Sequence, residues 1–209
     1  MLRFFPSNIK SVKEVAFLFL KQKKYAQALE YFTQLRKLGF KKADFFKGIG
    51  LTYFKLRKYK KAVYNLRLAL RKYRNSAELN YYLGTSYFYL RVYGISIKHL
   101  RKSIKLNPNF MKAYVNLAVV YRKIRQTRRE ERLYLNALSI NETSHIVYFN
   151  LGLFYERMNK LPLALMCYKK ALSLKAKDEV YAYQVSQAYI KMKRWDKSLK
   201  YLKITVQLN

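Results

Sequence analysis

Residues 80–108 read NYYLGTSYFYLRVYGISIKHLRKSIKLNP, and this stretch decides the fold. Leu83 and Gly84 form an aliphatic–glycine pair, Tyr87 follows three residues after the glycine, and Pro108 closes the stretch. The same pattern returns every 34 residues after an eight-residue lead, without insertion or deletion. A repeat of this length is typical of helix–turn–helix units that bury their apolar faces by stacking on their neighbours.

Four columns of the repeat carry this pattern. The aromatic column contains Phe19, Tyr53, Tyr87, Tyr121, Tyr155 and Tyr189. Three residues earlier, the first small column contains Ala16, Gly50, Gly84, Ala118, Gly152 and Ser186. Nine residues after the aromatic, the second small column contains Ala28, Ala62, Ser96, Glu130, Ala164 and Ser198. The third column contains Leu35, Ala69, Ser103, Ala137, Ala171 and Thr205. We expect the small residues to mark helix crossings and the aromatics to fill the core, so that trimming one aromatic to Ala costs about 3–5 kcal/mol.

The pattern resembles the tetratricopeptide repeat (TPR). The pair at Leu83 and Gly84, the tyrosine at Tyr87 and the closing Pro108 carry the resemblance, which covers nearly everything after the lead. The pentatricopeptide family, which binds single-stranded RNA, has a slightly longer repeat and usually lacks the aliphatic–glycine pair, so it fits less well. The resemblance implies an all-α fold, a right-handed superhelical α-solenoid of helix-turn-helix (TPR) repeats.

The period divides the chain into a lead and one solenoid domain. Residues 1–8 form an N-terminal lead or cap, and a single TPR solenoid follows over residues 9–209. In each copy we expect a first helix over about positions 1–14 and a second over positions 18–31. Ser7 and Asn8, which follow Pro6, are suited to cap the first helix, and Pro162 stands where a helix tolerates a missing amide. The copies are residues 9–42, 43–76, 77–110, 111–144, 145–178 and a shortened 179–209.

Several classes of function are disfavoured by the residue types. Cys167 is the single cysteine, and neither His99 nor His145 has a neighbour at a metal-ligand spacing, so we expect no metal and no cofactor. Glycine-rich phosphate loops and nucleophile motifs are missing from the sequence, which argues against an enzyme and against a small-molecule substrate. The apolar run at residues 15–20 is too short to cross a membrane, and a cytoplasmic protein is the expectation.

The chain is strongly basic, with 44 Lys and Arg against 11 Asp and Glu, or +33 at neutral pH. The first two copies carry 19 basic and 3 acidic residues, so about half of the charge lies in the first third. A coding bias toward AT-rich codons would raise the number of lysines, but it would raise the number of glutamates equally. Such a bias therefore does not explain the shortage of acidic residues. Such a field attracts polyanions, and binding of nucleic acid or an anionic membrane surface is therefore the alternative function. The basic surface predicted for it comprises Lys58, Lys60, Lys61, Arg67, Arg71, Lys72 and Arg74.

The resemblance also implies a groove lined by the first helix of each copy. Its floor is apolar, and position 13 of the repeat is basic in five of six copies. The leading prediction is therefore a non-catalytic protein–protein interaction scaffold or adaptor, which binds an extended or helical peptide with apolar anchors and acidic flanks. The opposing interpretation is that part of this set is ordinary helix packing and a solvated face. The predicted groove residues are Phe17, Lys21, Leu51, Lys55, Tyr81, Phe88, Val119, Lys123, Phe149, Arg157, Tyr183 and Lys191.

Two features depart from a regular array. Glu130 occupies a small-residue position, where a carboxylate is costly unless it is paired, and Arg128, Arg129 and Arg132 are its expected partners. We expect a widened or hydrated crossing there, or else an interruption that binds a partner. The last copy leaves Leu199, Leu202 and Val206 partly exposed, so this end self-associates, is covered by a partner or tolerates exposure. Self-association through the last helix is the preferred prediction.

Overall fold

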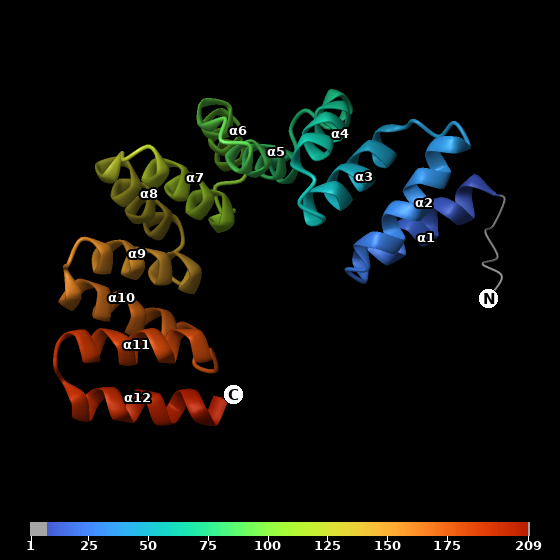
Figure 1. The fold of residues 1–209 in the computed structure, drawn as a ribbon. Helices are drawn as coiled ribbons and strands as arrows, with labels where there is room; N and C mark the ends of the chain where they lie inside the picture. The colour runs from blue at the N-terminus through green and yellow to red at the C-terminus, as the bar shows by residue number, and fades with distance from the viewer. Residues whose placement is uncertain (1–7, 209) are drawn as a thin grey trace. The chain divides into compact units, whose positions relative to one another are not determined.

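The computed structural model describes residues 8–208, which form helices joined by short turns (Figure 1). Of the predicted lead, residues 1–7 lie outside the described part, whereas the Asn8 side chain caps the first helix by accepting from the Lys10 amide at 2.9 Å. The helices are α1 (Ile9–Lys21), α2 (Tyr25–Lys37), α3 (Ala43–Lys55), α4 (Tyr59–Lys72), α5 (Ala77–Tyr89), α6 (Tyr93–Leu106), α7 (Met111–Lys123), α8 (Thr127–Ile140), α9 (His145–Arg157), α10 (Leu161–Leu174), α11 (Glu179–Lys191) and α12 (Trp195–Leu208).

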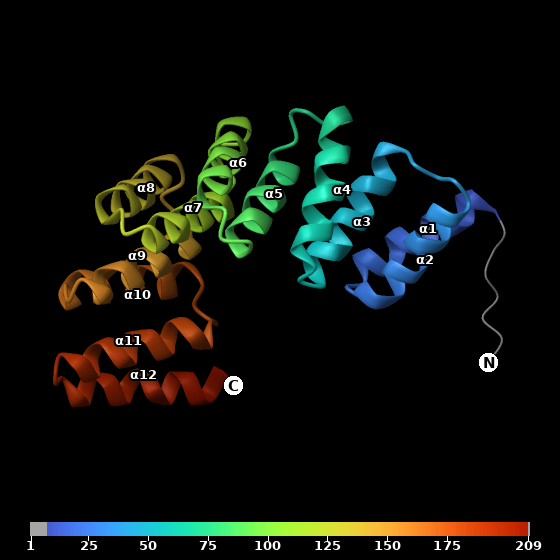
Figure 2. The same cartoon turned by 45° about the horizontal axis from the view of Figure 1, so that its top comes forward.

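The helices follow one another as antiparallel pairs, one pair to each 34-residue copy (Figure 2). First helices begin at position 1 as predicted, and second helices begin at position 17, one residue before the predicted start. Pro162 lies in the first turn of α10, as predicted. The chain divides into two compact units, of which the first ends at Asn107 and the second begins at Pro108. The first unit holds α1–α6 and the second holds α7–α12; the single solenoid domain remains a prediction.

The small columns are the helix crossings, as expected. All members of the first and second small columns are buried, Glu130 included, and in the third column only Thr205 is partly exposed. At Gly84 the backbones of α5 and α6 are so close that an added Cβ would lie 3.0 Å from the Leu100 amide nitrogen. The hydroxyl of Ser96 donates to the Gly84 carbonyl at 2.8 Å and fastens the same crossing.

Each turn within a pair has the same backbone conformation. The residue two before the second helix has a positive φ, and it is Lys or Arg in five of six copies. The next amide donates to the carbonyl of the aromatic-column residue, as Lys58 does to Tyr53 at 2.9 Å. This is the six-to-one bond of a Schellman cap, which satisfies the last carbonyls of the first helix. The turn residues are Lys23, Arg57, Arg91, Arg125, Asn159 and Lys193.

The aromatic column packs against the core, as predicted, but its members are only half-buried in the first unit. Tyr121, Tyr155 and Tyr189 are buried, whereas Phe19, Tyr53 and Tyr87 are half-buried. Each of these three rings packs against a core cluster of the first unit and keeps part of its surface accessible. Tyr31 stacks on Phe19, His99 stacks on Tyr87, and the Lys61 ammonium lies 5.7 Å from the Tyr53 ring centre.

We predict opposite effects for alanine at two glycines of the same helix pair. Gly84→Ala places a methyl group against the Leu100 and Ser96 backbones and should lower the free energy of unfolding by about 1–3 kcal/mol. Gly94→Ala, on α6, meets nothing within 4 Å and should raise it by up to about 1 kcal/mol through helix propensity. Urea denaturation followed by circular dichroism measures both. Equal effects of the two substitutions would show that the crossing is not close-packed.

Candidate functional site

The first helices of successive pairs also contact each other, α1 with α3, α3 with α5 and α7 with α9, so they form the inner layer of each unit. In the first unit the predicted groove side chains Phe17, Leu51, Tyr81 and Phe88 are half-buried on this layer. Some of that burial is helix packing, since Phe17 lies edge-on to Phe32 with ring centres 5.3 Å apart. These apolar side chains are therefore partly accessible, and the groove itself remains a prediction.

Two basic residues accompany these apolar side chains. Lys21 and Lys55 are exposed at the ends of α1 and α3, and neither has an acidic partner in the described part of the chain. The Lys55 ammonium lies 5.9 Å from the centre of the Tyr82 ring. Tyr89 occupies the equivalent place in the third copy, where its ring stacks on Tyr59 at 4.4 Å. The first unit thus has two exposed lysines without acidic partners among the described residues, and Lys55 of these lies beside an aromatic ring.

The second unit presents its groove residues differently. Val119 and Phe149 are half-buried, with Phe149 between Tyr168 and Tyr181 at ring distances of 5.9 and 4.8 Å, and Tyr183 is 46% exposed. Lys123 is exposed and has no acidic partner among the described residues.

The other two cations of the second unit's stripe form ion pairs inside the protein. Lys191 Nζ lies 2.5 Å from Glu156 Oε1, and Glu156 also accepts from the Tyr168 hydroxyl. Arg157 pairs with Glu130. Two predicted groove cations are therefore already neutralised from within.

Glu130 is only 2% exposed, and its partner is not one of the predicted arginines. Arg157 of α9 donates from its guanidinium Nη2 to Glu130 Oε2 at 2.7 Å. Arg128, Arg129 and Arg132 are exposed, because their positions on α8 face away from the crossing. The predicted partners are thus wrong: the carboxylate is held by the next pair, 27 residues along the chain.

The predicted basic surface lies on α4, the turn that precedes it and its exit. All seven side chains, Lys58, Lys60, Lys61, Arg67, Arg71, Lys72 and Arg74, are exposed. The positive field reaches His99 on α6: burial first, and then Lys98, Lys102 and Arg67, lower the pKa of His99 to about 4. The first unit therefore combines a dense cationic surface with little internal compensation.

The structure also shows the state of the single cysteine and of the possible metal ligands. Cys167 is buried, and burial raises the pKa of its thiol to about 11, so it is a protonated, unreactive thiol at neutral pH. No group of three potential metal ligands occurs within residues 8–208. None of the helices described is both long and apolar enough to cross a membrane.

Comparisons with known proteins agree with this architecture. Models of the tetratricopeptide repeat match residues 99–132 and residues 146–178, the second of which coincides with the predicted copy at 145–178. The chain is a tetratricopeptide repeat protein. Proteins with TPR domains generally act as protein–protein interaction scaffolds and are typically non-catalytic.

Solved structures with the same TPR arrangement include a crystal structure of MamA protein, 22% identical with a TM-score of 0.62, covering 79% of this chain and 91% of MamA. A MamA structure from Desulfovibrio magneticus RS-1, residue 41 to the end, is 19% identical with a TM-score of 0.63 and covers 79% and 94%. At these identities the likeness shows the fold. No curated protein matches the sequence.

One site of this TPR protein was missed by sequence reasoning. A cleft of about 660 Å³ opens among α2, α3 and α4, and it includes Lys60 and Lys61 of the predicted basic surface. Its other cations, Arg36 and Lys41, were not singled out, nor was Tyr64, which is 66% exposed. Comparison of the columns carried the signal, because Arg36 stands where four later copies have Leu or Ile.

We predict that the Glu130–Arg157 pair is a stability determinant of the TPR array. Arg157→Leu leaves a buried carboxylate without its partner and should lower the free energy of unfolding by about 3 kcal/mol. The double variant Glu130→Ala, Arg157→Leu restores the small residue of the column and should lie within about 1 kcal/mol of the original protein. Urea denaturation of both variants tests this, and a double variant as unstable as the single one would refute the pairing.

We also predict an acid-sensitive step in stability from His99. The pKa of His99 is about 4 in the folded state against 6.5 for an ordinary histidine, so between these values only the unfolded chain binds the proton. Stability should therefore fall as the pH is lowered from 6.5 to 4, by about 1–2 kcal/mol after allowance for the ring's partial exposure.

The matched variant is His99→Tyr, because Tyr31 and Tyr201 stand at this repeat position and stack on the aromatic column. Denaturation midpoints at pH 7 and pH 4.5 should differ less in this variant than in the original protein. Identical pH dependences would mean that His99 is not the titrating group.

Proposed function

We propose that this protein is a cytoplasmic, non-catalytic scaffold or adaptor that binds a peptide segment of another protein on the inner layer of its helix pairs. The observation that carries the proposal is the juxtaposition on this layer of half-buried apolar side chains with exposed lysines that lack acidic partners. Apolar anchors of a peptide would pack against Phe17, Leu51 and Tyr81, and acidic flanks would pair with Lys21 and Lys55.

The internal ion pairs sharpen the choice of anchoring residues. Arg157 and Lys191 form ion pairs with Glu130 and Glu156 that stabilise the array. Either cation would have to leave its ion pair in order to bind an acidic residue of a partner. Lys21, Lys55 and Lys123 have no acidic partner among the described residues, so they could bind a partner without breaking an ion pair. The proposal therefore assigns the recognition of acidic flanks to Lys21 and Lys55 within the first unit and to Lys123 within the second.

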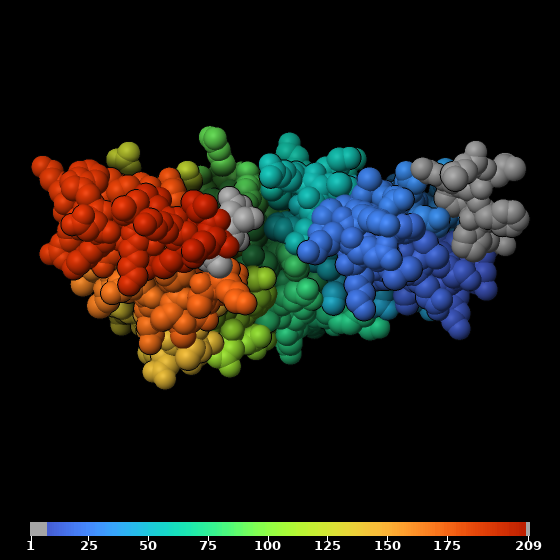
Figure 3. Space-filling model, turned by 90° about the horizontal axis from the view of Figure 1, so that it is seen from below, coloured from blue at the N-terminus to red at the C-terminus, as the bar shows by residue number. Residues whose placement is uncertain are grey.

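A second interaction surface is proposed at α12, where the sequence predicted self-association. Leu199 is 55% exposed and Val206 is 77% exposed, and no other helix of the second unit covers this face, which is red in Figure 3. Leu202 is half-buried. A second copy of the chain is the occupant that we propose for this face.

The groove proposal predicts that reversing its free cations abolishes partner capture. The original protein should capture a discrete partner from the source cell's lysate that survives nuclease treatment and a high-salt wash. With the triple variant Lys21→Glu, Lys55→Glu, Lys123→Glu, the amount of this partner that is captured should fall at least tenfold. The matched control reverses three exposed lysines of α6, Lys98, Lys102 and Lys105, and changes the net charge equally.

Quantitative mass spectrometry of the captured proteins is the readout, with circular dichroism as the check on folding. The control variant should retain the partner that the groove variant loses. Equal capture by both variants would contradict recognition at the inner layer. Capture that disappears with nuclease alone would favour the polyanion alternative.

A further inference from the structure

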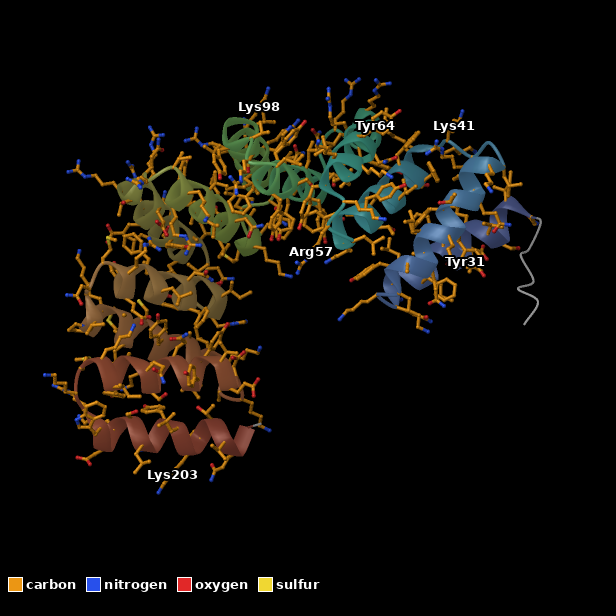
Figure 4. All side chains as sticks on the ribbon, in the orientation of Figure 1. Tyr31, Lys41, Arg57, Tyr64, Lys98 and Lys203 are labelled. Atoms are coloured by element: carbon orange, nitrogen blue, oxygen red, sulfur yellow. The ribbon has the colours of Figure 1, made fainter. Side chains whose placement is uncertain are left out.

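The cleft among α2, α3 and α4 of the first unit is formed by residues that differ from those of the other copies. Residues of α3 form its floor, α4 forms one wall, and the end of α2 with the following link forms the other. In Figure 4, Lys41 and Tyr64 lie on the same side of these helices. None of the ten lining residues is acidic: Arg36, Lys41, Phe45, Phe46, Ile49, Tyr53, Lys60, Lys61, Tyr64 and Asn65.

Arg36 is the first departure from the repeat that opens the cleft. At its repeat position the second to fifth copies have a half-buried aliphatic side chain, and the last copy has the exposed Val206. Arg36 is exposed instead, so it leaves that volume unfilled and places a guanidinium at the wall. The corresponding residues are Leu70, Ile104, Leu138 and Leu172.

Asn65 is the second departure. In the first, third and sixth copies this position holds Tyr31, His99 and Tyr201, whose rings stack on the aromatic column. Asn65 is too short to cover Tyr53, and its Nδ2 donates to the Lys61 carbonyl at 2.8 Å. The Tyr53 ring therefore lines the cleft.

Gly39 is the third departure. It has a φ of +76° and ends α2 one residue earlier than the other second helices end, with the Phe40 amide donating to the Leu35 carbonyl at 3.0 Å. The link from α2 to α3 is correspondingly one residue longer and carries Lys41 at the wall of the cleft. Three local changes thus act together to open and charge one crevice.

Tyr64 places an aromatic ring at a position where no other copy has one. Its position holds Glu, Lys, Arg, Met and Lys in the other copies, as expected of a solvent-facing site. At 66% exposure the ring contributes little to the core. An exposed ring among four cations is the combination that single-strand binding proteins use, because every base offers a flat face and every linkage offers a phosphate.

We propose that this cleft is a binding site for single-stranded nucleic acid, with a base stacked on Tyr64 and phosphates held by Arg36, Lys41, Lys60 and Lys61. The volume of about 660 Å³ accommodates one nucleotide. The exposed Arg67, Arg71, Lys72 and Arg74 continue the cationic surface along α4 and its exit, which favours a continuous strand over a free nucleotide. The site shares no residue with the groove of the proposed scaffold function and stands independently of it.

The binding test uses the full chain and two fluorescein-labelled probes, twelve-residue oligouridine and oligothymidine, measured by fluorescence anisotropy over a range of salt concentrations. Unlabelled oligoglutamate, inorganic polyphosphate and oligouridine serve as competitors. The cleft variant Arg36→Leu, Lys41→Asn introduces residues that other copies have at these positions, so the fold is retained. Its charge-matched control is Lys98→Gln, Lys102→Gln on α6, whose Lys98 is labelled in Figure 4.

Tyr64→Lys separates stacking from charge. It introduces the residue of the third and sixth copies and adds one positive charge while removing the ring. If the ring stacks on a base, affinity should fall about tenfold despite the added charge. The cleft variant should weaken binding by about tenfold and reduce the slope of log K against log salt by about 1.4, whereas the control should keep the original affinity within about twofold.

Other patterns overturn the proposal. Equal losses in the cleft variant and the control, with unchanged or tighter binding by Tyr64→Lys, would mean that the general field of the protein attracts the strand. Competition by oligoglutamate or polyphosphate at the same phosphate or carboxylate concentration as oligouridine would mean that the cleft selects charge and not bases. A difference between oligouridine and oligothymidine would identify which of the two strands the cleft prefers, and binding of either that depends on Tyr64 and on the cleft cations supports the site.

Discussion

The close approach of paired helix backbones is the constraint on which the rest of the structure depends. At Gly84 an added Cβ would lie 3.1 Å from the Ser96 carbonyl oxygen, and the Ser96 hydroxyl bonds to the Gly84 carbonyl across the same gap. Close contact of this kind requires small residues at two points of every copy. Larger side chains such as Phe32, Phe45 and Tyr168 fill the core between these points, and the copies differ at the positions that remain exposed.

Glu130 is an exception to that constraint, and its charge is neutralised by a cation that the inner layer would otherwise expose. Its carboxylate occupies a crossing, where an unpaired charge is strongly destabilising, and Arg157 neutralises it at 2.7 Å. The arginine is drawn from the basic column on the inner layer. In the second unit this column is therefore partly structural, since Lys191 is likewise paired with Glu156. In the first unit, Lys21 and Lys55 of the same column remain without acidic partners among the described residues.

The regular parts of the fold could be predicted from the sequence because they depend on local periodicity. The helix pairs and the small-residue crossings follow from spacing, and a cap at Ser7 or Asn8 follows from residue type, with Asn8 as the one that the structure shows. The partner of Glu130 could not be predicted in this way, because Arg157 reaches it from the next pair, and proximity in sequence wrongly favoured Arg128, Arg129 and Arg132. Half-burial of Phe19, Tyr53 and Tyr87 was also missed, because the column is aromatic in both units and the repeat pattern does not separate these rings from the buried Tyr121, Tyr155 and Tyr189.

The cleft among α2, α3 and α4 illustrates how a repeat protein acquires a local site without losing its array. Each copy contacts only its neighbours, so a change such as Arg36 for Leu affects one interface and leaves the others intact. That change forfeits apolar burial worth about 1 kcal/mol for a half-buried side chain. A coding bias toward AT-rich codons accounts for abundant Lys and Ile, but it gives no reason to replace Ile or Leu by Arg at one copy. The cost of this replacement, joined to Asn65, Gly39 and an exposed Tyr64 at the same crevice, argues that the cleft reflects selection for a ligand.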